Sequence, residues 1–87
     1  LELGLANRVV PAGELRDAAV AWGNALALRA PLSLAATKKV MRYAMDNQWA
    51  DCYDMEAELQ GQLAETDDMA EGVEAFFEKR AAQFKGR

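Results

Sequence analysis

The chain has 87 residues, 52% of them apolar and 28% charged, and its formal net charge is −4. This length allows one domain with a small core, the apolar content excludes a disordered chain, and the acidic balance argues against nucleic-acid binding. The single cysteine excludes an internal disulfide, and no stretch is long and apolar enough for a membrane span or an export signal. We therefore expect a globular, cytoplasmic protein.

Ahead of the first helix, residues 6–10 predict a short strand or an extended lead-in. Val9 and Val10 favour extended backbone, and Pro11 biases the residue before it away from the helical conformation. A helix is then predicted from Gly13 to Arg29, because its apolar residues recur at the spacing of one helical face. Those residues are Leu15, Ala18, Ala19, Trp22 and Leu26.

Three more helices are predicted along the chain. The second runs from Pro31 to Asp46, where proline suits the first turn, and the third from Gln48 to Glu65. The fourth runs from Asp67 to Ala82 after Thr66, a helix-capping residue type. The apolar stripes contain Leu32, Ala35, Ala36, Val40 and Ala44, then Trp49, Cys52, Met55, Leu59 and Leu63, then Met69, Val73, Phe76 and Phe77. The fold class is therefore all-α, a bundle of about four amphipathic helices.

The sequence lacks the residue types on which most catalytic sites depend. The chain has no histidine, which excludes histidine-based triads, Cys–His pairs and the usual zinc sites. Acidic residues are frequent between Asp46 and Glu78, but carboxylates on exposed helix faces lack the burial that makes a general acid. Cys52 falls on an apolar stripe, where a buried inert thiol is expected. We therefore predict no catalytic residue and no metal site.

Three sequence blocks carry a family resemblance. They are Gly-Leu-Ala-Asn-Arg-Val-Val-Pro at 4–11, Ala30-Pro31 followed by Ala-Thr-Lys-Lys at 36–39, and Thr-Asp-Asp-Met-Ala-Glu-Gly-Val-Glu-Ala-Phe-Phe-Glu-Lys-Arg at 66–80. In this order and spacing they resemble the ending of proteins of the crotonase superfamily, the enoyl-CoA hydratase/isomerase family. The resemblance extends over essentially the whole chain and is specific to the family, though not to one substrate.

The resemblance implies that residues 1–87 are the C-terminal helical segment of a longer parent enzyme. A start at Leu1 rather than methionine also predicts a fragment or a processed product. In this family a separate β/α core binds the acyl-CoA thioester and carries the oxyanion hole and the catalytic glutamates, and none of these lies in this sequence. The resemblance thus implies reversible hydration of 2-trans-enoyl-CoA by the parent, with double-bond isomerisation second, no required cofactor, and an inactive isolated segment.

The family's C-terminal helices form a trimer, or a dimer of trimers, and help to cover the acyl-CoA site. By resemblance, Phe76 and Lys79 are expected to approach the coenzyme A of a neighbouring subunit, with Lys79 near its phosphates, because an ammonium is a good phosphate partner. Ordinary packing of Phe76 and a solvated Lys79 remain open. Arg80 is expected to form an ion pair with a neighbouring acid.

Two other functions remain as alternatives. The chain could be a stand-alone helical protein-interaction module without a catalytic role, or a small enzyme with an unrecognised carboxylate site. The first and third blocks discriminate against a generic module, which has no need of them. The absence of histidine argues against a small enzyme.

Overall fold

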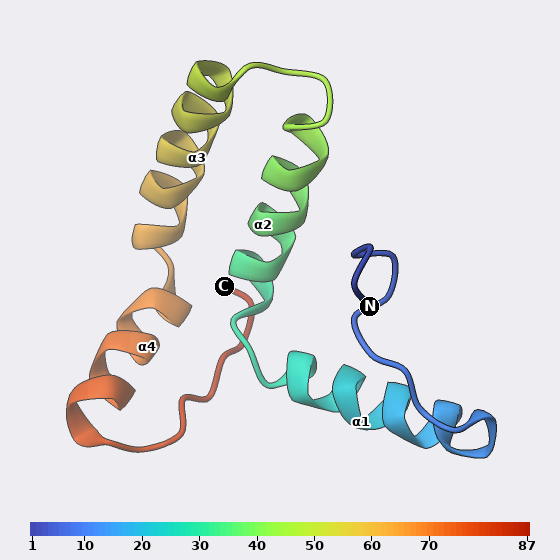
Figure 1. Cartoon of the computed structure of the whole chain (residues 1–87). Coiled ribbons are helices and arrows are strands. Elements are labelled where there is room, and N and C mark those ends of the chain that lie inside the picture. Colours follow the sequence, from blue (N-terminus) through green and yellow to red (C-terminus); the bar gives the residue numbers. More distant parts are fainter.

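The computed structural model describes all 87 residues, and they form helices, turns and irregular segments without a strand. A short 3₁₀ helix, η1 (Ala12–Glu14), is followed by α1 (Leu15–Ala27), α2 (Pro31–Tyr43), α3 (Trp49–Ala64) and α4 (Asp67–Glu78) (Figure 1). The all-α class with four helices is confirmed. Residues 6–10 form an irregular lead-in and not a strand, because none of their backbone groups hydrogen-bonds to another segment.

The helices are arranged openly around one hairpin. α2 and α3 run antiparallel, α1 projects from the start of α2, and α4 continues below α3 (Figure 1). Residues 81–87, which we call the tail, return from the end of α4 to the start of α2. The Cα radius of gyration is 16.3 Å, whereas a compact chain of this length has a radius of about 12 Å.

Local hydrogen bonds explain several helix ends. Pro31 begins α2, where its missing N–H costs nothing. The Thr66 hydroxyl accepts a hydrogen bond of 3.2 Å from the backbone N–H three residues later and so begins α4. α2 ends at Tyr43 and not at the predicted Asp46, and the Asn47 side chain donates to the Tyr43 carbonyl at 2.8 Å. The ends of α1 and α3 differ from the prediction by one or two residues, the usual scatter.

The largest difference from the prediction is the end of α4, which is Glu78 and not Ala82. Lys79 adopts the left-handed conformation, with φ 55° and ψ 37°. Its N–H donates to the Phe76 carbonyl at 3.4 Å, and the N–H of the next residue donates to the Ala75 carbonyl at 3.1 Å. These are the two hydrogen bonds of a Schellman motif. Glycine, the usual signal for this ending, is absent from position 79, so the sequence carries no mark of it.

The apolar stripes of α2 and α3 face each other. Ala36 and Val40 of α2 line a small groove of about 170 Å³ together with Leu59 and Leu63 of α3. These four residues are half-buried, as predicted. The prediction was wrong for Ala35, Ala44 and Trp49, which belong to the same predicted stripes and are exposed because they lie away from the groove between the two helices. Cys52, predicted to be buried, is also only half-buried.

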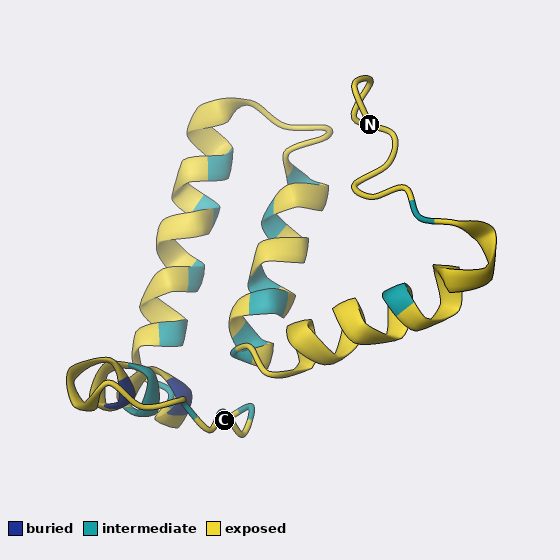
Figure 2. Cartoon of the chain, turned by 60° about the horizontal axis from the view of Figure 1, so that its bottom comes forward, coloured by how far each residue is buried: buried dark blue, intermediate teal, exposed yellow.

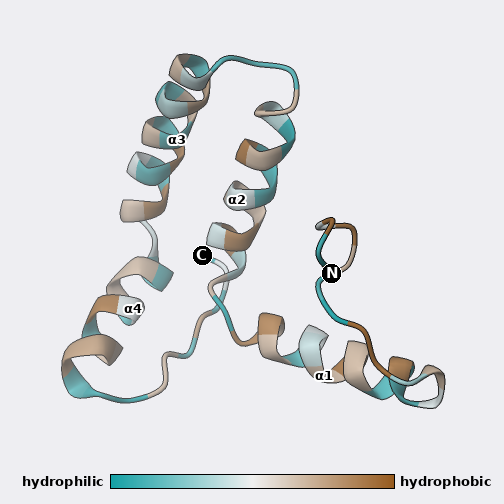
Figure 3. Cartoon of the chain, in the orientation of Figure 1, coloured by the Kyte–Doolittle hydropathy of each residue, from teal (hydrophilic) through white to brown (hydrophobic).

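The apolar faces of α1 and α4 stay largely open to solvent (Figures 2 and 3). Trp22 and Leu26 of α1 are 41% and 47% exposed, and Met69 of α4 is 49% exposed. Ala75 and Asp68 are the only buried residues of the chain. The accessible surface is 7608 Å², against about 5,000 Å² for a compact monomer of 9.5 kDa.

Candidate functional site

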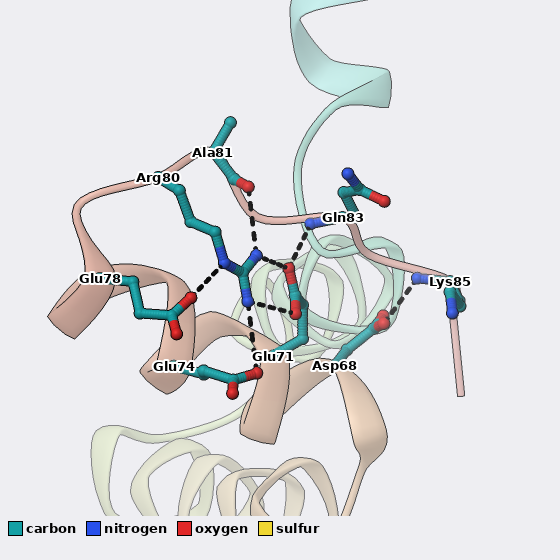
Figure 4. A network of polar contacts seen from close by, with 8 residues as sticks. All are labelled: Asp68, Glu71, Glu74, Glu78, Arg80, Ala81, Gln83 and Lys85. Atoms are coloured by element: carbon teal, nitrogen blue, oxygen red, sulfur yellow. Dashed lines mark hydrogen bonds and ion pairs between the residues drawn. The ribbon is translucent and has the colours of Figure 1, made fainter.

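The tail folds back along α4 and is attached at its far end by Asp68. This residue is only 5% exposed. One carboxylate oxygen accepts the Lys85 N–H at 2.6 Å, and the other accepts the Gly86 N–H at 2.8 Å. The Asp68 N–H donates in turn to the Arg87 carbonyl at 3.0 Å. Because hydrogen bonds to an ionised carboxylate are stronger than neutral ones, Asp68 fixes the end of the tail (Figure 4).

A second attachment lies around Arg80, directly after α4. Its two Nη atoms donate to the two carboxylate oxygens of Glu71 at 2.6 and 3.0 Å. One Nη also reaches Glu74 at 3.3 Å, and Nε donates to Glu78 at 2.6 Å (Figure 4). Glu71 further accepts the Gln83 N–H at 2.7 Å. The expectation that Arg80 pairs with a neighbouring acid is confirmed.

The charges of this cluster are fixed. The hydrogen bonds from Arg80 and then from the Gln83 N–H lower the pKa of Glu71 to about 2. The hydrogen bonds to Glu71 and then Glu78 raise the pKa of Arg80 above its already high ordinary value. Both groups are therefore charged at any neutral pH, so the cluster is an anchor and not a proton donor or acceptor.

Two glycines lie where the tail contacts its neighbours. A Cβ on Gly72 of α4 would lie 3.5 Å from the ring of Phe84, so that ring rests against the helix backbone. Gly86 has φ 75°, and a Cβ there would lie 3.3 Å from Cγ of Pro31. The tail is thus in contact with α4 along its length and with the start of α2 at its end.

Phe76 and Lys79, the predicted ligand contacts, lie on the outside of this structure. Phe76 is 78% exposed and meets the ring of Phe77, itself 77% exposed, edge to face at 5.7 Å. No carboxylate lies within 4.0 Å of the Lys79 ammonium. The two residues lie at the C-terminal end of α4, and a hydrogen bond from the Lys79 N–H to the Phe76 carbonyl links their backbones.

An open depression of about 500 Å³ adjoins Phe76, between the end of α1 and the tail. Its other lining residues include Ala25, Leu28, Arg29, Ala82 and Phe84. The side chains of the whole site suit binding rather than proton transfer. The supporting roles of Asp68 and Glu71 were not predicted from the sequence, where the two residues appear only as part of the acidic stretch and of the third block.

Two other features of the structure bear on function. No group of three or more histidine, cysteine, aspartate or glutamate side chains is arranged to hold a metal ion. None of the helices combines the length and the apolar content that crossing a membrane requires.

The family model described as Enoyl-CoA hydratase/isomerase matches residues 1–87. The chain is 37% identical over 82 residues to a putative enoyl-CoA hydratase of Thermus thermophilus, covering 94% of this chain and 32% of that protein. It is 31% identical over 88 residues to a short-chain-enoyl-CoA hydratase of Clostridium acetobutylicum, covering 100% of this chain and 34% of that one. The chain thus spans about a third of the length of these relatives.

A solved structure shows the same helix arrangement. The chain matches a crystal structure of an enoyl-CoA hydratase from Geobacillus kaustophilus with a TM-score of 0.92 and 33% identity, over 100% of this chain and 33% of that one. The open placement of α1 and α4 therefore recurs within a protein about three times as long. A match over the whole length argues against an unrelated stand-alone module.

Proposed function

Because this chain belongs to the enoyl-CoA hydratase/isomerase family, we propose that it is the C-terminal helical segment of an enzyme that acts on acyl-CoA thioesters. In that enzyme its helices serve oligomerisation and cover the coenzyme A site. The observation that carries this proposal is the exposure of the apolar faces of α1 and α4 in a chain whose arrangement matches a larger enzyme.

The exposed area has the size of a stable interface. The chain leaves about 2,500 Å² more surface exposed than a compact monomer of its mass. Specific interfaces bury about 1,200–2,000 Å² in total, and obligate ones bury more. Apolar burial stabilises by about 25 cal/mol per Å², so contacts with the rest of the enzyme and with other copies supply the core that these helices lack.

The reaction of the whole enzyme is proposed to be the reversible addition of water to a 2-trans-enoyl-CoA. Similar proteins include a 2,3-dehydroadipyl-CoA hydratase and a (E)-benzylidenesuccinyl-CoA hydratase, which differ in the acyl group and agree in the reaction type. The chemistry takes place on residues outside this chain, so the chain alone is inactive. The coenzyme A thioester is the substrate, and no further cofactor is needed.

Within this enzyme, Phe76 and Lys79 are the residues that meet coenzyme A. An exposed aromatic ring offers a face for the adenine base, by the stacking that proteins use for nucleobases. The Lys79 ammonium offers a charge for the phosphates, and no carboxylate of the chain competes for it.

A graft tests the proposed function. In the Clostridium acetobutylicum relative, the third that this chain matches is replaced by residues 1–87, giving what we call the grafted enzyme. The grafted enzyme is expected to form a defined oligomer and to hydrate crotonyl-CoA, whereas the isolated chain and the relative without that third are expected to be inactive. A soluble, folded and oligomeric grafted enzyme without hydratase activity would contradict the proposal.

A further inference from the structure

The acidic residues of α4 are all engaged, and the lysine at its end is not. Asp68 accepts backbone N–H groups of the tail, and Asp67 lies 3.4 Å from Arg87. The remaining three acids, Glu71, Glu74 and Glu78, are all bound by Arg80. Lys79 therefore follows a strongly acidic helix without an ion-pair partner.

Only a guanidinium could bind all three glutamates from this position. Arg80 uses Nε for Glu78 and its two Nη atoms for Glu71, with one Nη shared with Glu74 (Figure 4). These contacts exploit a rigid fork of five N–H donors, which the single ammonium of lysine cannot reproduce.

The same contacts hold the backbone on both sides of Lys79. Glu78 before it and Arg80 after it are joined at 2.6 Å. The left-handed conformation costs a non-glycine residue free energy and persists only where its surroundings impose it. The Arg80 cluster supplies that constraint together with the Schellman hydrogen bonds.

We propose that Arg80 is a positioning residue for the anion contact of Lys79, which it serves by neutralising the three glutamates of α4 and by fixing the turn from which Lys79 projects. This inference rests on the proposed contact between Lys79 and the coenzyme A phosphates. Without Arg80, three carboxylates would repel an approaching phosphate and compete for the ammonium.

The test uses the grafted enzyme and two substrates, crotonyl-CoA and crotonyl-pantetheine, which lacks the phosphorylated adenosine. The measured quantity is the ratio of kcat/KM for the two thioesters, which we call the CoA preference. Arg80→Ala is expected to lower the CoA preference roughly three- to tenfold, as expected for a few unscreened charges near a phosphate. The loss should appear mainly in KM for crotonyl-CoA, and Arg80→Lys should restore only part of it.

A rescue separates charge from folding. In the Arg80→Ala background, adding Glu74→Gln and Glu78→Gln is expected to restore most of the CoA preference. Neutralising Glu56 and Glu58 instead, two exposed acids of α3, should not restore it. If Arg80→Ala affects both thioesters equally, or if the Glu74 and Glu78 substitutions rescue nothing, the inference is overturned.

Lys79→Ala distinguishes this failure from failure of the proposed contact. If Lys79→Ala lowers the CoA preference and Arg80→Ala does not, the proposed contact stands and the positioning role is lost. If Lys79→Ala leaves the CoA preference unchanged, the contact itself is wrong and the role of Arg80 is lost with it.

Discussion

Single residues of the third sequence block divide into two groups. Thr66 caps α4, Asp68 and Glu71 accept N–H groups of the tail, and Gly72 lies beside the ring of Phe84. Phe76 and Lys79, in contrast, take part in none of these attachments, and both residues are exposed. The sequence could show that these residue types occur together, but not which atoms they meet, because the tail returns to α4 only in three dimensions.

The attachment by Asp68 predicts a clear difference between two adjacent aspartates. Asp68→Ala leaves the partly buried N–H groups of Lys85 and Gly86 without an acceptor. This loss costs about 1–3 kcal/mol, so the tail should detach from α4. Asp67→Ala removes an exposed ion pair with Arg87, worth at most about 1 kcal/mol. Hydrogen exchange of the Lys85 and Gly86 N–H groups in the grafted enzyme should rise in the first variant only. Equal exchange in both variants would contradict the role given to Asp68.

The lowered pKa of Glu71 predicts how the tail responds to acid. A carboxylate whose pKa falls on folding stabilises the folded state above its unfolded pKa, and the contribution is lost as the pH falls through the folded pKa. For Glu71 the stabilisation is therefore lost as the pH falls from about 4.5 to about 2. The Glu71 carboxyl carbon and the Gln83 N–H, followed by NMR, should therefore titrate together near pH 2. A midpoint near 4.5 would show that the Arg80 cluster does not form in solution.

At the scale of the elements, the periodicity of apolar residues predicted all four helices. The prediction was wrong at the end of α4, which depends on the backbone conformation of one residue. Of the two alternatives given for residues 6–10, the strand did not form. α4 ends four residues before the predicted end because Lys79 adopts a left-handed conformation, which a lysine in the sequence does not predict. The lead-in at 6–10 pairs with nothing, although Arg8 lies 5.3 Å from the centre of the Trp22 ring and so contacts α1.

Two glycines of the same structure are predicted to respond to alanine with opposite sign. Gly72→Ala places a methyl group at ordinary contact distance from Phe84 and should stabilise α4 by about 0.5–1 kcal/mol, because glycine weakens a helix interior. Gly86→Ala forces a positive φ on alanine beside Pro31 and should destabilise by about 1–2 kcal/mol.

Thermal unfolding of the grafted enzyme measures both effects. The midpoint should rise for Gly72→Ala and fall for Gly86→Ala. A fall for both variants would mean that the Phe84 ring lies closer to α4 than the 3.5 Å contact allows. No change for Gly86→Ala would mean that the tail is not held against α2.

At the scale of the whole molecule, the sequence indicated which faces are apolar but not which of them find a partner within the chain. The stripes of α2 and α3 meet, so most of their predicted residues are half-buried, whereas Ala35, Ala44 and Trp49 stay exposed. Those of α1 and α4 do not, and Trp22, Leu26 and Phe76 stay exposed. The proposed burial of these faces against other surfaces cannot be derived from one chain, because it depends on atoms that the chain does not contain.

The central claim is that these open faces are made for contact with other protein surfaces, and the mass of the chain in solution tests it most directly. Light scattering after size exclusion, at concentrations up to high micromolar, should show a discrete oligomer, because association removes apolar surface from water. A folded monomer throughout this range would contradict the claim.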